Sequence, residues 1–543
     1  MKTTVLKDIL GLILIIGIFW GFTLGQHPIA APDSARYVEI PREMVATGDY
    51  LTPHLNGLKY FEKPPLFYWM QAGALKLFNL NEISVCIVNA LLMLGIAILI
   101  YLMGLTFYDR LSGLIAALGY AFTIFAFAFT RLICLDTPLT FFLTAFLSSF
   151  LIATRHTGKK RTFLLALSYL SCGCAVLTKG IIGAIFPGLL VLYWLTAQHE
   201  WKNLKSYHPW LGLTLFLAVV LPWHILVQLK NPEFNYFYFV EQHFLRFFTD
   251  YADRDKPLWF LPVVLFAGIY PWSSMLFPAI WKSFKTSVIN RTLIYWSCGI
   301  LLFFIFSKSQ LIPYILPIIP TLMLIIGNYL APYLTSTAQP PRSTNFALYI
   351  AAGIAFIFAF GLFFTAPIID LSLRGFTANN LIVLGVLFAI TGLITLFYHH
   401  RYNFTAGIVA LTLGTGACLL YASPYLATIH SIKPLIMTLK SQLKPQDIVI
   451  DYNNYHQDIP VYLERTITVV NYQGELAFGI KHNPKQDWMI NSEQFWQLWL
   501  GAKTCYLFIE EPVYLKLMQQ TKPHSTFVLL DKFQNVLLFK NHL

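Results

Sequence analysis

The stretch ISVCIVNALLMLGIAILIYLMGLT, residues 83–106, contains no charged side chain. At about 1.5 Å per residue, a helix of this length crosses the roughly 30 Å hydrocarbon core of a bilayer. Similar runs recur along the 543-residue chain, of which 57% is hydrophobic and 12% is charged. Because soluble domains carry about 25% charged residues, the sequence predicts an α-helical polytopic membrane protein.

The apolar runs predict about thirteen membrane-spanning helices. The first run could also be a secretory signal peptide, but it lacks a small-x-small cleavage site and further spans follow, so we interpret it as a retained helix. The expected spans are residues 9–25, 83–106, 112–129, 137–153, 162–178, 181–197, 210–227, 258–279, 292–306, 311–332, 345–367, 379–398 and 404–424.

Basic residues gather in alternate loops, and this pattern orients the chain. Placing those loops in the cytoplasm satisfies the positive-inside rule, and the odd number of spans puts the C-terminal tail outside. A net charge of +12 could indicate nucleic-acid binding, but the charges are spread over short loops, so we expect no nucleic-acid partner. The cytoplasmic set is Lys2, Lys7, Arg110, Arg155, Lys159, Lys160, Arg161, Lys202, Lys205, Lys282, Lys285, Arg291, Arg342 and Arg401.

We expect the chain to divide into a membrane domain, residues 1–427, and an outer α/β domain, residues 428–543. In the tail, short strands such as DIVIDY (447–452) alternate with helices such as SEQFWQLWLGA (492–502), which is typical of a small α/β domain. Within the membrane domain, the outer segment 26–82 is expected to form amphipathic helices on the membrane surface. Two such helices are expected, at residues 35–47 and 65–78.

Two aspartates lie where expected spans meet the outer loops. Asp33 follows the first span, and Asp136 ends the motif RLICLD (131–136). Ionisable groups at the membrane edge are costly and usually face a cavity, which favours a catalytic role. The alternatives are that Asp33 caps a helix, and that Asp136 forms a salt bridge with Arg131 or with another loop.

The motif KYFEKPPLFYW, residues 59–69, places an acid beside a base. Pro64 holds Lys63 in an extended conformation, and neighbours on extended backbone point in opposite directions. Glu62 and Lys63 are therefore expected not to neutralise each other, and Lys63 could face a headgroup or ligand. The alternative is plain interfacial anchoring by a lysine among aromatic residues.

Further basic groups fall on the outer side, against the positive-inside trend. Lys179 lies in LTKG, Arg246 in VEQHFLRF and Lys308 in FSKSQLIPYILP. A bound phosphate would explain them, whereas snorkelling along the bilayer edge is the alternative. Tyr314, between two prolines, could line the same pocket or belong to the aromatic belt.

A metal site is a weaker alternative at the same face. Glu62, Glu241 and His243 could bind a divalent cation, although Glu-x-His is not the usual i, i+3 or i, i+4 ligand spacing of a helix.

The motif Asp253-Arg254-Asp255 resembles the DxD of nucleotide-sugar transferases but lacks a strand–turn context, so we interpret it as a solvated turn. The seven cysteines show no C-x-x-C or zinc spacing. Glycine loops for phosphates are absent, so the sequence shows no means of using ATP.

Two classes of function remain. A transporter of lipids or solutes would fit the many spans, but such proteins usually carry repeated halves and broken helices at mid-membrane, and the sequence shows neither. An enzyme acting on a lipid-borne substrate fits the charged groups clustered on one face together with an outer domain.

The motifs resemble a known family. D-x-x-RY-x-EI-x-REM-x-x-x-GD-x-x-x-P (33–53) followed by NGLKYFEKPPLFYW (56–69) is similar to GT-C-type polyprenyl-phosphate-dependent glycosyltransferases, closest to the aminoarabinose transferases of lipid A and related to protein mannosyltransferases. RLICLDTPL, LTKG, VEQHFLRF and SKSQLIPYILP follow in the family's order. The resemblance covers essentially the whole chain.

The resemblance implies an enzyme of the bacterial inner membrane with a periplasmic active site. It would transfer a sugar, with inversion, from undecaprenyl phosphate to an outer acceptor. The best match is 4-amino-4-deoxy-L-arabinose and a lipid A phosphate; another polyprenyl-linked sugar, with a protein or surface glycan as acceptor, is the alternative. No cofactor is required. The resemblance implies catalytic roles for Asp33, Asp136 and Glu62. We expect substrate contacts from the cations and the tyrosine, namely Lys63, Arg36, Arg131, Arg246, Lys179, Lys308 and Tyr314.

One stretch departs from the family. Its members commonly carry an arginine near the start of the second span, in a context such as S-x-R-L-P, where this chain has ISVCIVNA with Cys86. This difference could change the donor, the acceptor or neither, and it does not bear on lipid-linked sugar transfer itself.

Overall fold

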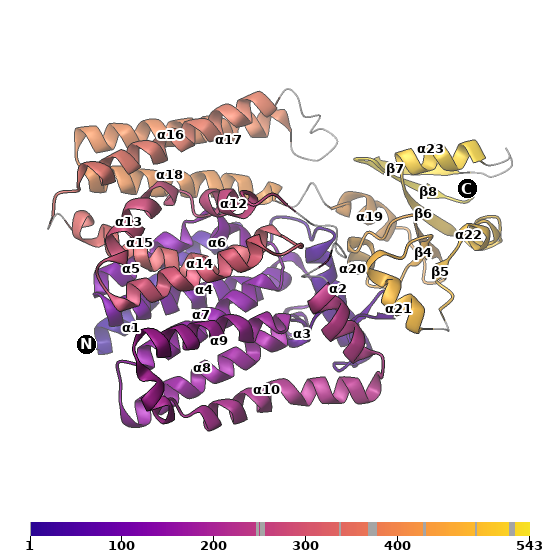
Figure 1. Cartoon of the computed structure of the whole chain (residues 1–543). Helices are drawn as coiled ribbons and strands as arrows, with labels where there is room; N and C mark the ends of the chain where they lie inside the picture. The colour runs from indigo at the N-terminus through magenta and orange to yellow at the C-terminus, as the bar shows by residue number, and fades with distance from the viewer. Residues whose placement is uncertain are drawn as a thin grey trace.

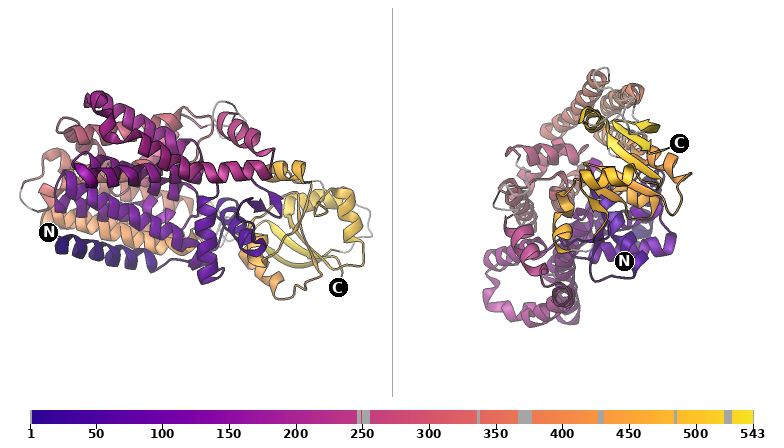
Figure 2. Two further views of the ribbon diagram at one scale, coloured as in Figure 1. Left: turned by 90° about the horizontal axis from the view of Figure 1, so that it is seen from below. Right: turned by 90° about the vertical axis from the view of Figure 1, so that its right-hand side faces the viewer.

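A long helical bundle joined at one end to a small α/β domain makes up the molecule (Figure 1). The computed structural model describes residues 2–245, 249, 256–335, 338–366, 377–426, 431–483, 486–520 and 527–542. The helices of the bundle run roughly parallel or antiparallel to one another, and Figure 2 shows the α/β domain beyond one end of them. This arrangement agrees with a polytopic membrane protein that carries a small α/β domain at one end of its helices.

Ten described helices are long and apolar enough to cross a bilayer, and a bent pair is a candidate eleventh. The helices of the bundle are α1 (Lys2–Gly21), α4 (Glu82–Phe107), α5 (Arg110–Ala121), α6 (Ile124–Phe129), α7 (Asp136–Ala153), α8 (Gly158–Lys179), α9 (Ile182–Ala197), α10 (Pro209–Lys230), α12 (Phe260–Gly268), α13 (Leu276–Phe284), α14 (Val288–Ile305), α15 (Ile319–Leu334), α16 (Arg342–Thr365), α17 (Ala378–Arg401) and α18 (Phe404–Ala422). A π-helical segment, Tyr236–Leu245, and the 3₁₀ turns Glu200–Tyr207, Ser273–Met275, Ile312–Ile318 and Ser423–Tyr425 connect them.

Three of the thirteen expected spans take a different form. The expected span 112–129 is divided into α5 and α6, because the Thr123 side chain accepts from the Ala126 N–H and starts a new helix. The expected span 258–279 is bent by 112° between α12 and the segment Ser273–Phe284. The span expected at 181–197 is α9, an apolar helix of 16 residues.

Small residues allow the helices of the bundle to approach closely. A Cβ added to Gly104 of α4 would lie 2.3 Å from the Cα of Gly113 in α5, and one added to Gly183 of α9 would lie 2.4 Å from a backbone carbon of Ala175 in α8. Lipid chains are as apolar as leucine, so association inside a bilayer depends on such close packing. These close contacts set the positions of α4 against α5 and of α8 against α9.

The outer segment between α1 and α4 forms two helices and a hairpin. They are α2 (Asp33–Thr47), α3 (Leu66–Phe78), β1 (His54–Leu55) and β2 (Leu58–Lys59). The alternative in which Asp33 caps α2 is wrong, because Pro32 occupies the cap position with no side-chain cap and Asp33 lies in the first turn. Ser34 instead accepts from the Ile133 N–H at 3.1 Å, which ties α2 to the loop before α7.

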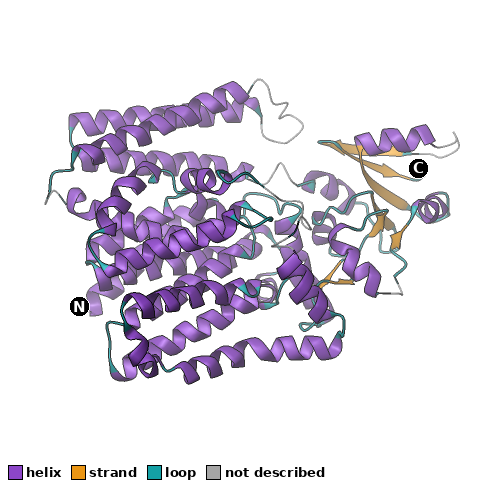
Figure 3. Cartoon of the chain, viewed as in Figure 1, coloured by secondary structure: helices purple, strands orange, loops and turns teal. Residues whose placement is uncertain are grey.

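The C-terminal domain contains a six-stranded mixed sheet in the order β5-β4-β3-β6-β8-β7 (Figure 3). Strands β5, β4, β3 and β6 are parallel, and β8 and β7 continue the sheet antiparallel. The strands are β3 (Ile448–Tyr452), β4 (Thr468–Val470), β5 (Met489–Ile490), β6 (Cys505–Glu510), β7 (Val528–Phe533) and β8 (Val536–Lys540), with helices α19 (Lys433–Lys440), α20 (Asp458–Leu463), α21 (Ala477–His482), α22 (Ser492–Trp499) and α23 (Glu511–Gln520).

The C-terminal domain is fastened to the outer segment by buried polar contacts. The Asn56 amide donates to the Ile467 carbonyl at 3.0 Å and accepts from the Ile467 N–H at 2.9 Å. The Tyr462 hydroxyl accepts from the Ile29 N–H at 2.8 Å. Since buried polar atoms that lose their partners are costly, these contacts hold the domain in one position over the end of the bundle.

Candidate active site

The helical hairpin of α7 and α8 brings an acid and a base together at one end of the bundle. Asp136 lies in the first turn of α7, and Lys179 is the last residue of α8. Because the two helices are antiparallel neighbours, these positions coincide in space, and each charge is favourable at its own helix end. The Lys179 ammonium donates to the Asp136 carboxylate, and both side chains are less than a tenth exposed.

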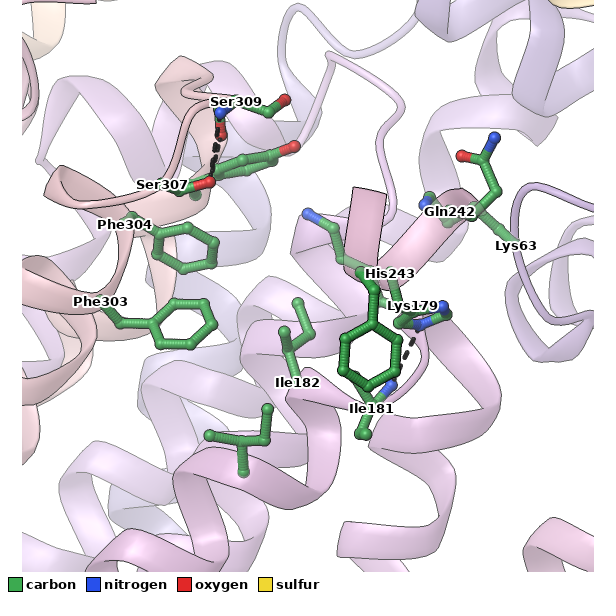
Figure 4. Close-up of a pocket in the computed structure, with 13 residues that line it drawn as sticks. Lys63, Lys179, Ile181, Ile182, Gln242, His243, Phe303, Phe304, Ser307 and Ser309 are labelled. Atoms are coloured by element: carbon green, nitrogen blue, oxygen red, sulfur yellow. Dashed lines mark hydrogen bonds between the residues drawn. The ribbon is translucent and has the colours of Figure 1, made fainter. Parts of the chain in front are cut away.

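A cavity of about 260 Å³ opens beside Lys179 (Figure 4). Two lysines, Lys63 and Lys179, line it together with Tyr314, whose ring lies 4.3 Å from the Lys179 ammonium. The opposite wall is apolar, as the close-up shows for Phe303 and Phe304. The rest of the lining consists of Ile181, Ile182, Ile185, Gln242, His243, Phe244, Ser307 and Ser309.

Glu62 and Lys63 lie at a bend of the chain between β2 and α3. Lys63 lines the cavity, whereas Glu62 is absent from its lining. The charge of Glu62 instead acts on tyrosines of the outer segment: burial raises the pKa of Tyr60 and of Tyr68, and Glu62 adds to both shifts. The Glu-Lys pair therefore spans two neighbouring groups of residues.

The second group is a chain of ion pairs around Arg36. Its guanidinium donates to the Asp33 carboxylate at 2.5 Å and to the Tyr60 hydroxyl at 3.2 Å, and it forms an ion pair with Glu475 at 2.7 Å. Asp33 is 54% exposed, whereas Glu475 is 11% exposed and also accepts from Gln457 at 2.5 Å. Burial raises the pKa of Glu475 against the opposing effect of Arg36. The C-terminal domain thus supplies a buried carboxylate that helps to position Asp33.

Arg131 lies outside the cavity. Its guanidinium donates to Ser423 at 2.7 Å, to Thr23 at 2.7 Å and to the carbonyl of Trp20 at 2.8 Å, and its side chain stacks on Phe127. These contacts join the end of α1, the helix α6 and the turn after α18. The alternative of an Arg131–Asp136 salt bridge is wrong, since Asp136 pairs with Lys179.

The remaining predicted residues are distributed as follows. Lys308 lies between the lining residues Ser307 and Ser309 without lining the cavity itself. Arg246 and the motif Asp253-Arg254-Asp255 lie outside the described residues.

In the described part of the chain, no three His, Cys, Asp or Glu side chains gather as they would around a metal ion. His243 lines the cavity; its Nδ1 lies 2.6 Å from the Tyr238 carbonyl, and its Nε2 accepts from the Ile181 N–H at 3.3 Å.

Four residues near the candidate site were not predicted from the sequence: Glu475, Gln242, Ser307 and Ser309. Gln242 and the serines carry no charge, so the sequence did not distinguish them from other polar residues between the spans. Glu475 lies more than 400 residues from Arg36 along the chain, and only the docked C-terminal domain reveals the contact.

Two family models match the chain. Residues 29–238 match the model described as dolichyl-phosphate-mannose-protein mannosyltransferase, and residues 435–537 match the aminoarabinose transferase C-terminal domain. The first covers the outer segment and the α7–α8 hairpin. The second covers most of the sheet domain.

The structure is similar to the crystal structure of ArnT from Cupriavidus metallidurans bound to undecaprenyl phosphate. The TM-score is 0.86, the sequence identity is 22%, and 98% of each chain is covered. The apo state of the same protein gives a TM-score of 0.85. This likeness establishes the fold.

Relatives in sequence are named undecaprenyl phosphate-α-4-amino-4-deoxy-L-arabinose arabinosyl transferases. The one from Sodalis glossinidius is 32% identical over 332 residues, or 60% of each chain, so the match spans about three fifths of that relative. The one from Pectobacterium carotovorum is 26% identical over 93% of this chain and 91% of its own. The one from Proteus mirabilis is 31% identical over 67% of this chain and 69% of its own. The chain therefore belongs to the family of undecaprenyl phosphate-α-4-amino-4-deoxy-L-arabinose arabinosyl transferases.

Proposed function

We propose that the protein is a glycosyltransferase that takes a sugar from a polyprenyl phosphate and transfers it to an acceptor at the outer face of the membrane. The observation that carries this proposal is the composition of the cavity. Lys63 and Lys179 supply two cations at its polar side, and an apolar wall that includes Phe303 and Phe304 faces them. A phosphate attached to a long apolar chain matches both features.

The proposed reaction breaks the bond between the sugar C1 and the donor phosphate oxygen, and the electron pair leaves with the phosphate. A new bond forms between C1 and an acceptor oxygen on the opposite face of the sugar, which inverts the anomeric configuration. Fixed cations that meet the negative charge as it develops stabilise the transition state. We assign this role to Lys63 and Lys179, because both line the cavity.

We propose different roles for the two aspartates. Asp136 holds the Lys179 ammonium in the cavity, because the two side chains are paired and buried. Asp33 keeps more than half of its side chain exposed, so it can reach an acceptor. It would accept the proton of a hydroxyl acceptor as a general base, or orient a phosphate acceptor and stabilise positive charge on the sugar ring.

For the substrates, we propose undecaprenyl phosphate-linked 4-amino-4-deoxy-L-arabinose as donor and a lipid A phosphate as acceptor. The names of the relatives support the donor, and the motif resemblance supports the acceptor. The basic loops support an inner-membrane orientation with the site in the periplasm. We also propose a domain boundary near residue 427, with 26–82 as a periplasmic segment of the membrane domain.

The proposed transfer consumes no nucleotide, because the sugar arrives already bonded to a phosphate leaving group. We therefore propose that no cofactor is required. The competing hypothesis is a divalent cation between Glu62 and His243. The contact of the His243 Nδ1 with a backbone carbonyl is the orientation in which a ligating histidine is usually held, but a cation at Nε2 would have to displace the hydrogen bond from the Ile181 N–H.

Mass spectrometry of lipid A tests the proposal, using a host that lacks its own transferase and expresses this protein or its Lys63→Ala variant. We expect one aminoarabinose increment per modified phosphate with the wild type and none with the variant, at equal membrane levels of the two proteins. A different sugar increment would retain the acceptor and replace the donor. Unmodified lipid A in cells that contain the donor would reject lipid A as the acceptor.

A further inference from the structure

A second large groove lies at the end of the bundle away from the C-terminal domain, where α13 appears at the left of Figure 1. Its volume is about 1160 Å³. It shares no lining residue with the cavity beside Lys179. Helix α13, the end of α15 and the start of α16 form it, with the lining Ser274, Phe277, Pro278, Ile280, Trp281, Lys282, Phe284, Lys285, Tyr329, Tyr333, Pro341, Ser343, Phe346, Ala347 and Ile350.

Large apolar side chains stand exposed around the groove. Phe277 is 68% exposed, Trp281 is 73% exposed and Phe346 is 65% exposed. On the other side of α13, Ala279 and Ser283 are buried against the bundle. An amphipathic helix with exposed aromatic residues beside lysines is typical of the membrane interface. The groove therefore opens toward lipid.

The groove carries positive charge without acidic side chains in its lining. The Lys282 ammonium donates to the Tyr333 hydroxyl at 3.1 Å and lies 5.5 Å from the centre of the Tyr329 ring. Lys285 lies 5.0 Å from the Trp281 ring. Among the described residues, neither lysine forms an ion pair with a carboxylate, in contrast to Arg110, which pairs with Asp8 at 2.6 Å.

The start of α16 adds to this positive potential. The helix begins at Arg342, between the lining residues Pro341 and Ser343, and Pro341 provides no side-chain cap. The first N–H groups of a helix carry partial positive charge and favour anions. The lysines, the tyrosine hydroxyl and this helix end thus face one region of the groove, while Phe277, Trp281 and Phe346 border the other.

We propose that this groove binds an anionic glycerophospholipid of the bilayer. Its phosphate lies against Lys282, Lys285 and the Tyr333 hydroxyl, and its acyl chains run along the exposed aromatic residues. Basic pockets between membrane helices recognise anionic headgroups in this way. A soluble phosphate would leave the apolar part of the groove unfilled. The bound lipid would brace α13 where the chain is bent by 112° after α12.

Native mass spectrometry of the full-length purified protein tests this proposal, with phosphatidylglycerol and phosphatidylcholine of identical acyl chains as probes. We expect the wild type to retain phosphatidylglycerol preferentially. The double variant K282Q/K285Q should bind it about five- to tenfold more weakly, which corresponds to roughly 1–1.4 kcal/mol. The matched control K202Q/K205Q loses the same charge from exposed positions outside the groove and should bind as the wild type does.

A second variant with a smaller structural change keeps the proposal testable if K282Q/K285Q does not fold. Tyr333→Phe removes one hydroxyl and keeps the ring, and it should weaken phosphatidylglycerol binding about two- to threefold. Equal binding of the two lipids by the wild type would overturn the proposal. So would unchanged phosphatidylglycerol binding in a folded K282Q/K285Q protein, or an equal loss in the control. None of these outcomes depends on the transferase reaction.

Discussion

Arg36 of α2 forms an ion pair with Glu475 of the C-terminal domain at 2.7 Å, and the same guanidinium donates to Asp33 at 2.5 Å. The C-terminal domain is thus connected to the candidate catalytic carboxylate by one buried arginine. Asn56 and Tyr462 fix the docking of the domain close by. The C-terminal domain is therefore part of the site's support rather than a separate module.

Glu475→Gln should lower the transfer rate about tenfold without changing the KM for the lipid donor. The variant keeps the size of the side chain but removes the charge that balances Arg36, so Asp33 becomes the only carboxylate paired with that arginine. Glu475 does not line the cavity, so donor binding should persist. Steady-state kinetics with purified protein give both values.

The control for Glu475→Gln is Glu464→Gln. Glu464 lies in the same domain, is 59% exposed and pairs with Lys440, and exposed pairs contribute little. Wild-type kcat in Glu475→Gln, or an equal loss in Glu464→Gln, would show that the ion-pair chain does not support the reaction.

Lys63→Ala should reduce transfer at least a hundredfold, because removal of one preorganised charge from a transition-state site costs about 10²–10³ in kcat. Lys59→Ala is the matched control. Lys59 lies four residues earlier, pairs with Glu233 at 2.7 Å and does not line the cavity. Transfer of sugar to lipid A in membrane vesicles measures both variants. Wild-type activity in a correctly inserted Lys63→Ala protein would exclude Lys63 from the donor site.

Asp136→Asn and Lys179→Met should be strongly non-additive. Each change alone breaks the buried pair and leaves one group without its partner, so each should lower transfer by at least tenfold. The double variant should be no worse than the poorer single variant, because residues that act as a unit lose their function together. A double-mutant cycle on kcat/KM measures the coupling. If the losses of kcat/KM in the two single variants multiply in the double variant, Asp136 and Lys179 act independently and the proposed pair is wrong.

The apolar runs predicted most of the bundle, because a bilayer leaves a helix few alternatives. The interruptions at Thr123 and between α12 and α13 were not predicted, since local capping and packing break apolar stretches that composition alone describes as continuous. The strands of the C-terminal domain were expected near their observed positions. The short strand β5 and helices α19, α20 and α21 were missed, because a few residues give no periodicity to detect.

Part of the candidate site was predictable where a basic residue departs from the positive-inside rule. Lys63 and Lys179 line one cavity, as outward-facing cations suggested. Arg131 was expected to contact the substrate, but it lies outside the cavity. The free-energy cost of burying its guanidinium is offset by hydrogen bonds to a backbone carbonyl and hydroxyls from separate segments of the chain. No local pattern reveals such partners. The pairing of Arg36 with Glu475 was equally hidden, since it depends on how two domains dock.

Chelation should leave transfer within twofold of its starting rate. Lys63 and Lys179 already supply positive charge to the cavity, so the proposed reaction has fixed cations without a metal ion. Purified protein treated with EDTA and assayed for transfer measures this directly. Loss of activity that added Zn²⁺ restores, and that His243→Ala no longer shows, would instead establish the Glu62–His243 metal site.

The stability of the protein should fall as the pH rises from about 6.5 to about 9, through His456. This imidazole is largely buried, and its Nδ1 donates to the buried Asp451 carboxylate at 3.0 Å. Burial opposes its charge, but Asp451 outweighs that effect and raises the pKa of His456 from 6.5 to about 9. A raised pKa means that the folded state holds the proton more tightly than the unfolded state does. The stabilisation is complete below 6.5 and is lost above the folded pKa.

The loss amounts to at most about 3–4 kcal/mol, because the pKa rises from 6.5 to about 9 and each pKa unit is worth about 1.4 kcal/mol. Burial raises the pKa of the neighbouring Asp458 only to about 6, so most of its titration precedes this window. Thermal unfolding of the full-length protein should show a larger difference in Tm between wild type and His456→Gln at pH 6.5 than at pH 9. His542→Gln, in the same domain, should show no such difference. A gap between wild type and His456→Gln that stays constant across this range would mean that the His456–Asp451 pair is not charged in the folded protein.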